Sequence, residues 1–219
     1  MLNNINPTVW SNNYIYIAKS PLTKFYRNFL IKKLKFFEIT KDKNSSILDF
    51  GCGFGYILNY FYSRGYRNLY GVDPDKEFLK RVPKQIKTSL QFGEKTNFED
   101  NSFDVVFVYC VLHHLEKDKN YFEAIDEIMR VLKPKGYLFI CEPGHYRSFI
   151  IMAYITKILS FFSKFFKSYN SLLDEEKIIV HYFIKNHYKV IDRLREKKIK
   201  EIENTYKYEK WLYVCQKLN

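Results

Sequence analysis

The chain has 219 residues, with 47% hydrophobic and 19% aromatic residues, which excludes an intrinsically disordered protein and suits one globular domain. The net charge is +12 but is unevenly spread, because residues 1–46 carry +6, residues 47–144 carry −1 and residues 145–219 carry +7. Basic flanks around a neutral centre indicate either an anionic partner or ordinary solubilising lysine.

Two further features indicate a cytoplasmic protein. The first 20 residues contain no basic segment followed by a long apolar core, so we expect no secretory signal. The cysteines lie far apart and include no Cys-x-x-Cys pair, so we expect neither a disulfide framework nor a metal site. They are Cys52, Cys110, Cys141 and Cys215.

The middle of the chain predicts alternating strands and helices, because short apolar runs end at glycine or Asp-Pro and amphipathic runs separate them. The expected strands are residues 46–50, 68–72, 89–92, 103–108 and 137–141. The expected helices are residues 56–64, 75–81 and 121–132. This alternation is typical of a doubly wound α/β sheet.

The last 75 residues contain neither glycine nor proline, which predicts longer helices and a hairpin with looser turns. We expect a helix at residues 149–167, with a narrow polar stripe of lysine and serine, and another at 174–186. Residues 188–196 and 210–216 are expected to form two antiparallel strands.

The central motif is a glycine-rich turn between the first strand and the first helix of this pattern. It reads Asp49-Phe50-Gly51-Cys52-Gly53-Phe54-Gly55. Glycine allows a nucleoside to approach the backbone closely, and the helix N-terminus offers N–H groups. The glycine spacing differs from that of dinucleotide sites, and an acid before the first glycine would repel a pyrophosphate but suit a cationic ligand.

These residues resemble the class I S-adenosylmethionine-dependent methyltransferases, most closely the broad branch called methyltransferase type 11 or ubiquinone-biosynthesis-like. The resemblance covers about residues 45–144. It implies S-adenosylmethionine as cofactor, S-adenosylhomocysteine as product, and a Rossmann-like, doubly wound, mostly parallel seven-stranded sheet with a C-terminal antiparallel hairpin. The expected single domain comprises an N-terminal helical segment (1–45), a cofactor-binding core (46–144), a helical insert after strand five (145–187) and a closing hairpin (188–219).

The family's motifs also imply a set of cofactor contacts. Asp73, at the end of the second strand, would accept both ribose hydroxyls, and Pro74 would pack on the adenine. Glu94 would take the adenine amino group unless it is simply solvated, and the backbone of Lys95 would meet the ring. The expected cofactor-binding residues are Asp49, Gly51, Cys52, Gly53, Gly55, Asp73, Pro74, Glu94, Lys95 and Tyr109.

Ligands of open α/β sheets bind beyond the carboxyl ends of the strands, which places the methyl acceptor near residues 109–114 and 142–145. His113, His114 and His145 are candidate catalytic bases, with Glu142 as a fourth, because a hydroxyl acceptor must lose a proton. The alternatives are that these histidines only line the pocket, or that methyl transfer proceeds by proximity without a base.

Aromatic and basic residues in the N-terminal segment and in the 149–167 helix favour a small-molecule acceptor that is amphipathic or lipid-linked. The apolar part of this helix is too short to span a bilayer, so residues 148–169 are expected to form a lid, a core helix or a peripheral membrane contact. The sequence leaves open the acceptor's identity, the methylated atom and the oligomeric state.

Three other functions are compatible with parts of the pattern. They are an RNA methyltransferase using the basic flanks, a non-catalytic cofactor-binding protein of the same fold, and a nicotinamide oxidoreductase. DNA base methylation is not expected, because the Asp/Asn-Pro-Pro-aromatic motif of that group does not follow the fourth strand. An RNA methyltransferase is not favoured, since no known RNA-binding module accompanies the basic flanks.

Overall fold

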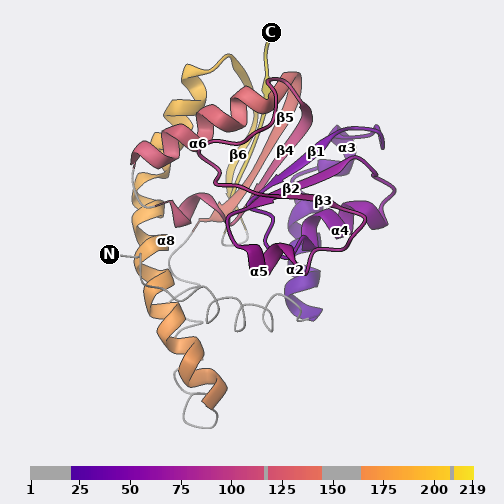
Figure 1. Ribbon diagram of the computed structural model, residues 1–219. Helices are drawn as coiled ribbons and strands as arrows, with labels where there is room; N and C mark the ends of the chain where they lie inside the picture. Colours follow the sequence, from indigo (N-terminus) through magenta and orange to yellow (C-terminus); the bar gives the residue numbers. More distant parts are fainter. Residues whose placement is uncertain (1–20, 116–117, 145–163, 208–209) are drawn as a thin grey trace.

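The computed structural model describes residues 21–115, 118–144, 164–207 and 210–219 (Figure 1). Within these ranges seven strands form one sheet in the order β3-β2-β1-β4-β5-β7-β6. The strands are β1 (Ile47–Phe50), β2 (Leu69–Asp73), β3 (Lys87–Leu90), β4 (Phe103–Tyr109), β5 (Leu132–Pro143), β6 (Ile199–Lys207) and β7 (Lys210–Lys217). The first five strands pair in parallel, and β7 runs antiparallel to β5 and β6. The expected mostly parallel sheet with a C-terminal antiparallel hairpin is confirmed.

Helices cover both faces of this sheet, as doubly wound folds require (Figure 1). The helical elements are α2 (Pro21–Lys33), α3 (Phe36–Ile39), α4 (Tyr56–Ser63), α5 (Lys76–Leu79), the 3-10 turn η1 (Leu112–His114), α6 (Asp118–Val131) and α8 (Lys164–Glu196). Along β1, Leu48 and Phe50 point into the core beneath α6 and α8, whereas Ile47 points into the core beneath α2, α3 and α4. No helix of the described ranges is long and apolar enough to cross a bilayer.

The C-terminal third differs from the expected pattern. Helix α8 runs without a break to Glu196, so the strand expected at 188–196 is wrong, and the helix expected at 174–186 is only part of α8. The buried residues Phe183, Val190 and Leu194 recur at helical spacing, which a short window of apolar residues does not distinguish from a strand. The antiparallel partner of β7 is β6, and most of the helix expected at 149–167 lies outside the described residues.

The third strand is also displaced from its expected position. We expected residues 89–92, but β3 spans Lys87–Leu90, and Phe92 lies beyond it with 70% of its side chain exposed. β3 is an edge strand with mostly exposed residues, so no buried face fixes its register in the sequence. Pairing with β2, which sets Asp73 opposite Leu90, determines the register instead.

Candidate cofactor and acceptor site

The glycine turn after β1 forms the floor of the candidate site. Gly51, Gly53 and Gly55 all adopt left-handed backbone, with φ of 79°, 51° and 68°. A Cβ on Gly51 would lie 2.4 Å from a side-chain carbon of Val111, so only glycine allows this turn to pass the loop after β4. The turn therefore presents backbone rather than side chains at the carboxyl end of β1.

Asp73 lies directly beside the glycine turn. One of its carboxylate oxygens accepts a hydrogen bond from the backbone N–H of Gly53 at 2.8 Å, and the other accepts one from Asp75 at 2.8 Å. Burial raises the pKa of Asp73, and these two N–H groups oppose that effect. Each carboxylate oxygen keeps a further lone pair, so the group can still accept bonds from a diol.

Asp49 is the most unusual ionisable group at this edge of the sheet. Its side chain is only 2% exposed, and its Oδ2 has no hydrogen-bond partner in the part of the chain that the structure describes. Burial raises the pKa of Asp49 to about 8, the negative charge of Asp73 adds to this shift, and the positive charge of Arg27 opposes it. A buried acceptor without a donor is costly, so the site is complementary to a ligand that brings a cationic donor.

Arg27 is a second buried charge that the sequence did not reveal. It lies on α2, is 7% exposed, and its guanidinium carbon stands 4.9 Å from the centre of the Tyr56 ring. Tyr56 is the first residue of α4, immediately after the glycine turn. Nothing in the local sequence marks Arg27, because only the packing of α2 against the sheet brings it to this site.

The ends of β4 and β5 are joined by a buried pair formed by His113 and Glu142. Nδ1 of His113 lies 2.6 Å from Oε2 of Glu142, and the other carboxylate oxygen accepts the backbone N–H groups of Val111 and Leu112 at 2.7 and 2.8 Å. Burial opposes ionisation of Glu142, but His113 and the two N–H groups outweigh it and hold its pKa below the usual value.

The other two candidate bases differ in position. His114 is exposed, and its ring centre lies 4.0 Å from that of His113. His145 lies outside the described residues. The structure therefore brings His113 and Glu142 together in one buried pair and leaves His114 beside them at the surface.

A contact between Lys210 and Cys110 links β7 to β4 at the carboxyl ends of the parallel strands, and the sequence analysis did not predict it. Nζ of Lys210, at the start of β7, lies 3.2 Å from Sγ of Cys110, whose backbone is left-handed with φ of 56°. The same ammonium stands 5.9 Å from the ring centre of Tyr109. Burial opposes the charge of Lys210, but the neighbouring Cys110, Tyr109 and Cys141 groups hold its pKa well above the usual value.

The remaining expected cofactor contacts occupy the same edge. Pro74 and Lys95 are exposed on the loops after β2 and β3, and Glu94 is half-buried. Cys52 is buried, and a Cβ built on Gly71 would lie only 2.6 Å from its Sγ. The side chain of Cys52 therefore packs against β2, which leaves its backbone to face a ligand. Within the described residues there is no cluster of His, Cys, Asp or Glu that could hold a metal ion.

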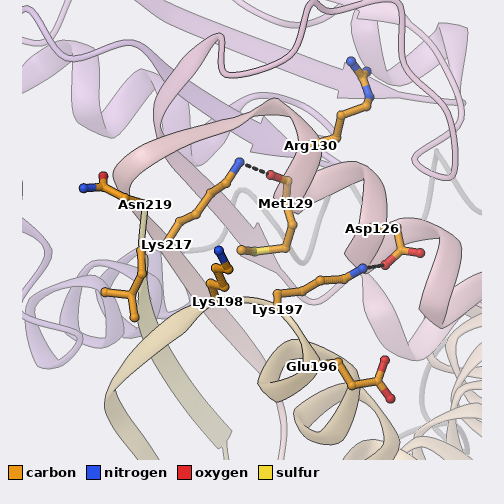
Figure 2. Close-up of a pocket in the computed structure, with 9 residues that line it drawn as sticks. Asp126, Met129, Arg130, Glu196, Lys197, Lys198, Lys217 and Asn219 are labelled. Carbon is orange, nitrogen blue, oxygen red and sulfur yellow. Dashed lines mark hydrogen bonds and ion pairs between the residues drawn. The ribbon is translucent and has the colours of Figure 1, made fainter.

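A separate hollow of about 460 Å³ lies at the far end of the sheet, where β7 ends (Figure 2). Two lysines that line it are paired with other lining residues, since Nζ of Lys217 donates to the carbonyl of Met129 at 2.6 Å and Lys197 pairs with Asp126 at 2.6 Å. Because β7 is antiparallel to β5, this hollow lies at the amino ends of the parallel strands. It does not belong to the candidate site.

Residues 48–140 match the family model described as Methyltransferase domain. An uncharacterized protein of Methanocaldococcus jannaschii is 33% identical over 128 residues, which cover 58% of this chain and 53% of that protein. A tRNA U34 carboxymethyltransferase of Hahella chejuensis is 34% identical over 104 residues, covering 44% of this chain and 31% of that protein. The matched parts of this chain thus span about half or less of these curated relatives.

A solved structure resembles this chain over most of its length. A Pyrococcus horikoshii protein superimposes with a TM-score of 0.66 at 14% identity, covering 91% of this chain and 93% of that chain. At this level of identity the likeness shows a shared fold. The fold thus extends beyond residues 48–140 to the helices and strands on either side of the matched segment.

Proposed function

We propose that this chain, whose residues 48–140 form a methyltransferase domain of the class I fold, transfers the methyl group of S-adenosylmethionine to a small-molecule acceptor. Its relatives are matched over only part of their length, so the cofactor, the acceptor and the reaction all belong to this proposal.

The observation that carries the proposal is the unpaired carboxylate of Asp49 behind the glycine turn. Asp49 and Asp73 are two buried acids, and the negative charge of Asp73 opposes the ionisation of Asp49. A pyrophosphate would add negative charge to this pair, which argues against a nicotinamide cofactor. S-adenosylmethionine carries an ammonium and a sulfonium, so it would supply the missing positive charge and a donor for Asp49.

The other cofactor contacts follow from the order of the strands. Asp73 would accept the two ribose hydroxyls, and the backbone of the glycine turn, including Cys52, would lie against the cofactor. Pro74, Glu94 and Lys95 stand on adjoining loops and would surround the adenine. Tyr109, at the end of β4, would border the reacting methyl group.

The cofactor supplies a methyl group on a positively charged sulfur, and the acceptor must present a lone pair in line with it. If the acceptor is a hydroxyl, His113 is the base that the geometry supports best. Its Nδ1 faces Glu142, and this carboxylate would stabilise the imidazolium that forms when the ring takes the proton. His114 is the exposed alternative, and transfer by proximity alone needs neither histidine.

The surroundings of this edge support an acceptor with an apolar part and a negative charge. Phe25 and Phe92 each expose 70% of their side chains, and Lys210 places a positive charge beside Tyr109. An amphipathic or lipid-linked acceptor has both properties. The roles expected of residues 148–169 as lid, core helix or membrane contact fall mostly outside the described residues and remain part of this proposal.

An RNA acceptor is the second candidate. The net charge of +12 and the tRNA-modifying relative from Hahella chejuensis support it. RNA binding that weakens steeply with salt would favour this candidate over a small molecule, because phosphate contacts release counterions.

Calorimetric titration with S-adenosylhomocysteine tests the cofactor. We expect binding by the wild type, and a loss of at least about tenfold in Asp73→Ala, because hydrogen bonds to a charged group are lost. Glu77→Gln, which removes an acid from the neighbouring helix α5, is the matched control and should bind normally. Binding of NAD in place of S-adenosylhomocysteine, or equal binding by Asp73→Ala, would contradict the proposal.

A further inference from the structure

We propose that Lys210 is the anion-binding residue of the acceptor pocket, and that the methyl acceptor therefore carries a carboxylate or a phosphate group. This inference rests on the proposed function and names the chemical class of its substrate. Lys210 begins β7, far outside residues 48–140 that match the family model.

The ammonium of Lys210 lies where the acceptor is expected. Because β7 is antiparallel to β5, its first residue stands at the carboxyl ends of the parallel strands, and pairing sets Lys210 opposite Pro143 at the end of β5. Its Nζ reaches across to Cys110, the residue after β4, and lies 3.2 Å from the sulfur. Ligands of open α/β sheets bind beyond such strand ends, so this charge lies at the edge where the acceptor must meet the cofactor.

The ammonium of Lys210 also keeps donors for a ligand. Lys217, near the other end of the same strand, uses its ammonium fully, since it donates to three oxygen atoms at 3.0, 2.6 and 2.6 Å. Lys210 is half-buried, and its hydrogen-bond acceptor in the described part of the chain is the sulfur of Cys110. Sulfur is a weak acceptor and an ammonium has three donors, so Lys210 has bonding capacity that the protein does not use.

The charge of Lys210 lacks an acidic partner as well. Its contacts are the Cys110 sulfur and the ring of Tyr109, and no carboxylate of the described residues lies within ion-pair distance. Glu142, the buried acid at the end of β5, already binds His113 and two backbone N–H groups. A cation that is partly removed from water needs a counter-charge, and an anionic group on the acceptor supplies it. A neutral or cationic acceptor would leave this charge uncompensated.

The thiolate of Cys110 is the alternative counter-charge, so the test must separate binding of an external anion from activation of the thiol. Iodoacetate and iodoacetamide achieve this. Both alkylate a thiolate by the same step, in which the sulfur bonds to the methylene carbon and iodide leaves, but only iodoacetate carries a carboxylate. The ratio of their labelling rates at Cys110 cancels the thiolate fraction and reports attraction of the anion.

Peptide mapping by mass spectrometry gives this ratio for Cys110 in each protein. We expect the ratio of iodoacetate to iodoacetamide labelling to fall at least about tenfold in Lys210→Met, the effect of losing one hydrogen bond between charged groups. Lys210→Arg keeps the charge and should retain most of the ratio. Lys207→Met, which removes an exposed lysine from β6, is the matched control and should leave the ratio unchanged.

Competition in the wild type provides a second test that needs no variant. Acetate and inorganic phosphate, each replacing chloride at constant ionic strength, should slow the labelling of Cys110 by iodoacetate. The anion that protects at the lower concentration indicates whether the acceptor's group is a carboxylate or a phosphate. Protection by neither anion would overturn the inference.

Two further results would also overturn it. An equal ratio in the wild type and in Lys210→Met would mean that the ammonium serves the thiol alone. Loss of the iodoacetate preference when S-adenosylhomocysteine is bound would assign the anion site to the cofactor, because an acceptor site stays open beside the bound product. A preference for iodoacetate in a protein that does not bind S-adenosylhomocysteine would instead overturn the proposed function and leave the anion site in place.

Discussion

His113 and Glu142 are paired through a 2.6 Å contact between Nδ1 and Oε2, in a place where both side chains are almost completely buried. The pair connects the turn after β4 to the end of β5, the two strands that border the expected acceptor position. Because Glu142 also accepts two backbone N–H groups, it fixes the shape of this turn as well as the orientation of the histidine.

We predict that Glu142→Gln lowers the free energy of unfolding by about 1–3 kcal/mol, since a charged acceptor serving three donors becomes neutral. The folded-state pKa of Glu142 is depressed, so its contribution is present above the unfolded value of 4.5 and is lost as pH falls through the folded value. Urea unfolding of the wild type and of Glu142→Gln at pH 7 and pH 4 measures this contribution. The difference in unfolding free energy between the two proteins should be smaller at pH 4 than at pH 7.

The matched control for this change is Glu99→Gln, because Glu99 is exposed in the loop before β4. Its effect should stay within about 0.5 kcal/mol at either pH. A Glu142→Gln protein as stable as the control would show that the buried pair contributes nothing to folding.

Asp49→Asn should stabilise the protein while removing cofactor binding. The pKa of Asp49 rises from 3.8 to about 8 on folding, so the folded state holds a proton that the unfolded state releases between these values. Stability due to Asp49 therefore falls as pH rises from about 4 to 8, and the neutral amide avoids this loss. Thermal unfolding at pH 5 and pH 9 should show that Asp49→Asn raises the melting temperature more at pH 9 than at pH 5. A melting temperature below that of the wild type at pH 9 would contradict this prediction.

Binding of S-adenosylhomocysteine should strengthen as pH rises toward 8. At pH 7 Asp49 is mainly protonated, and it must lose that proton before it can pair with an ammonium. Calorimetry in buffers of different ionisation enthalpy should therefore detect proton release on binding. 5′-Methylthioadenosine, which has no ammonium, should release none, and equal proton release by both ligands would assign the effect to another group.

Cys110 should be the cysteine that reacts first with iodoacetamide. Burial raises the pKa of the other three thiols, to about 12 for Cys215 and well above the usual range for Cys52 and Cys141. Cys110 is half-buried beside the ammonium of Lys210, which stabilises a thiolate. Peptide mapping by mass spectrometry at pH 7 should show labelling of Cys110 at least about tenfold faster than of the others.

The variant that tests this explanation is Lys210→Met, in which labelling of Cys110 should slow by about tenfold. Lys207→Met removes an exposed lysine from the adjacent strand and should have no effect. Rapid labelling that survives Lys210→Met would show that exposure alone makes Cys110 reactive.

The errors in the sequence analysis share a cause. Residues 188–196 contain apolar residues that suit a strand in a short window, but in the structure they continue helix α8, which packs against α6 and η1. β3 has no buried face, so its position depends on β2. In both places the deciding interactions join residues far apart in the chain, and local pattern does not contain them.

The sequence by itself determined the parts of this protein that depend on neighbouring residues. The glycines at 51, 53 and 55, the apolar runs of β1 and β4, and the acid that closes β2 are all local signals, and they sufficed to place β1, β2, β4 and the turn after β1. Only the tertiary structure decided which charges meet there. Arg27 approaches Asp49, and Lys210 approaches Cys110, because packing of α2 and pairing of β7 bring distant residues together.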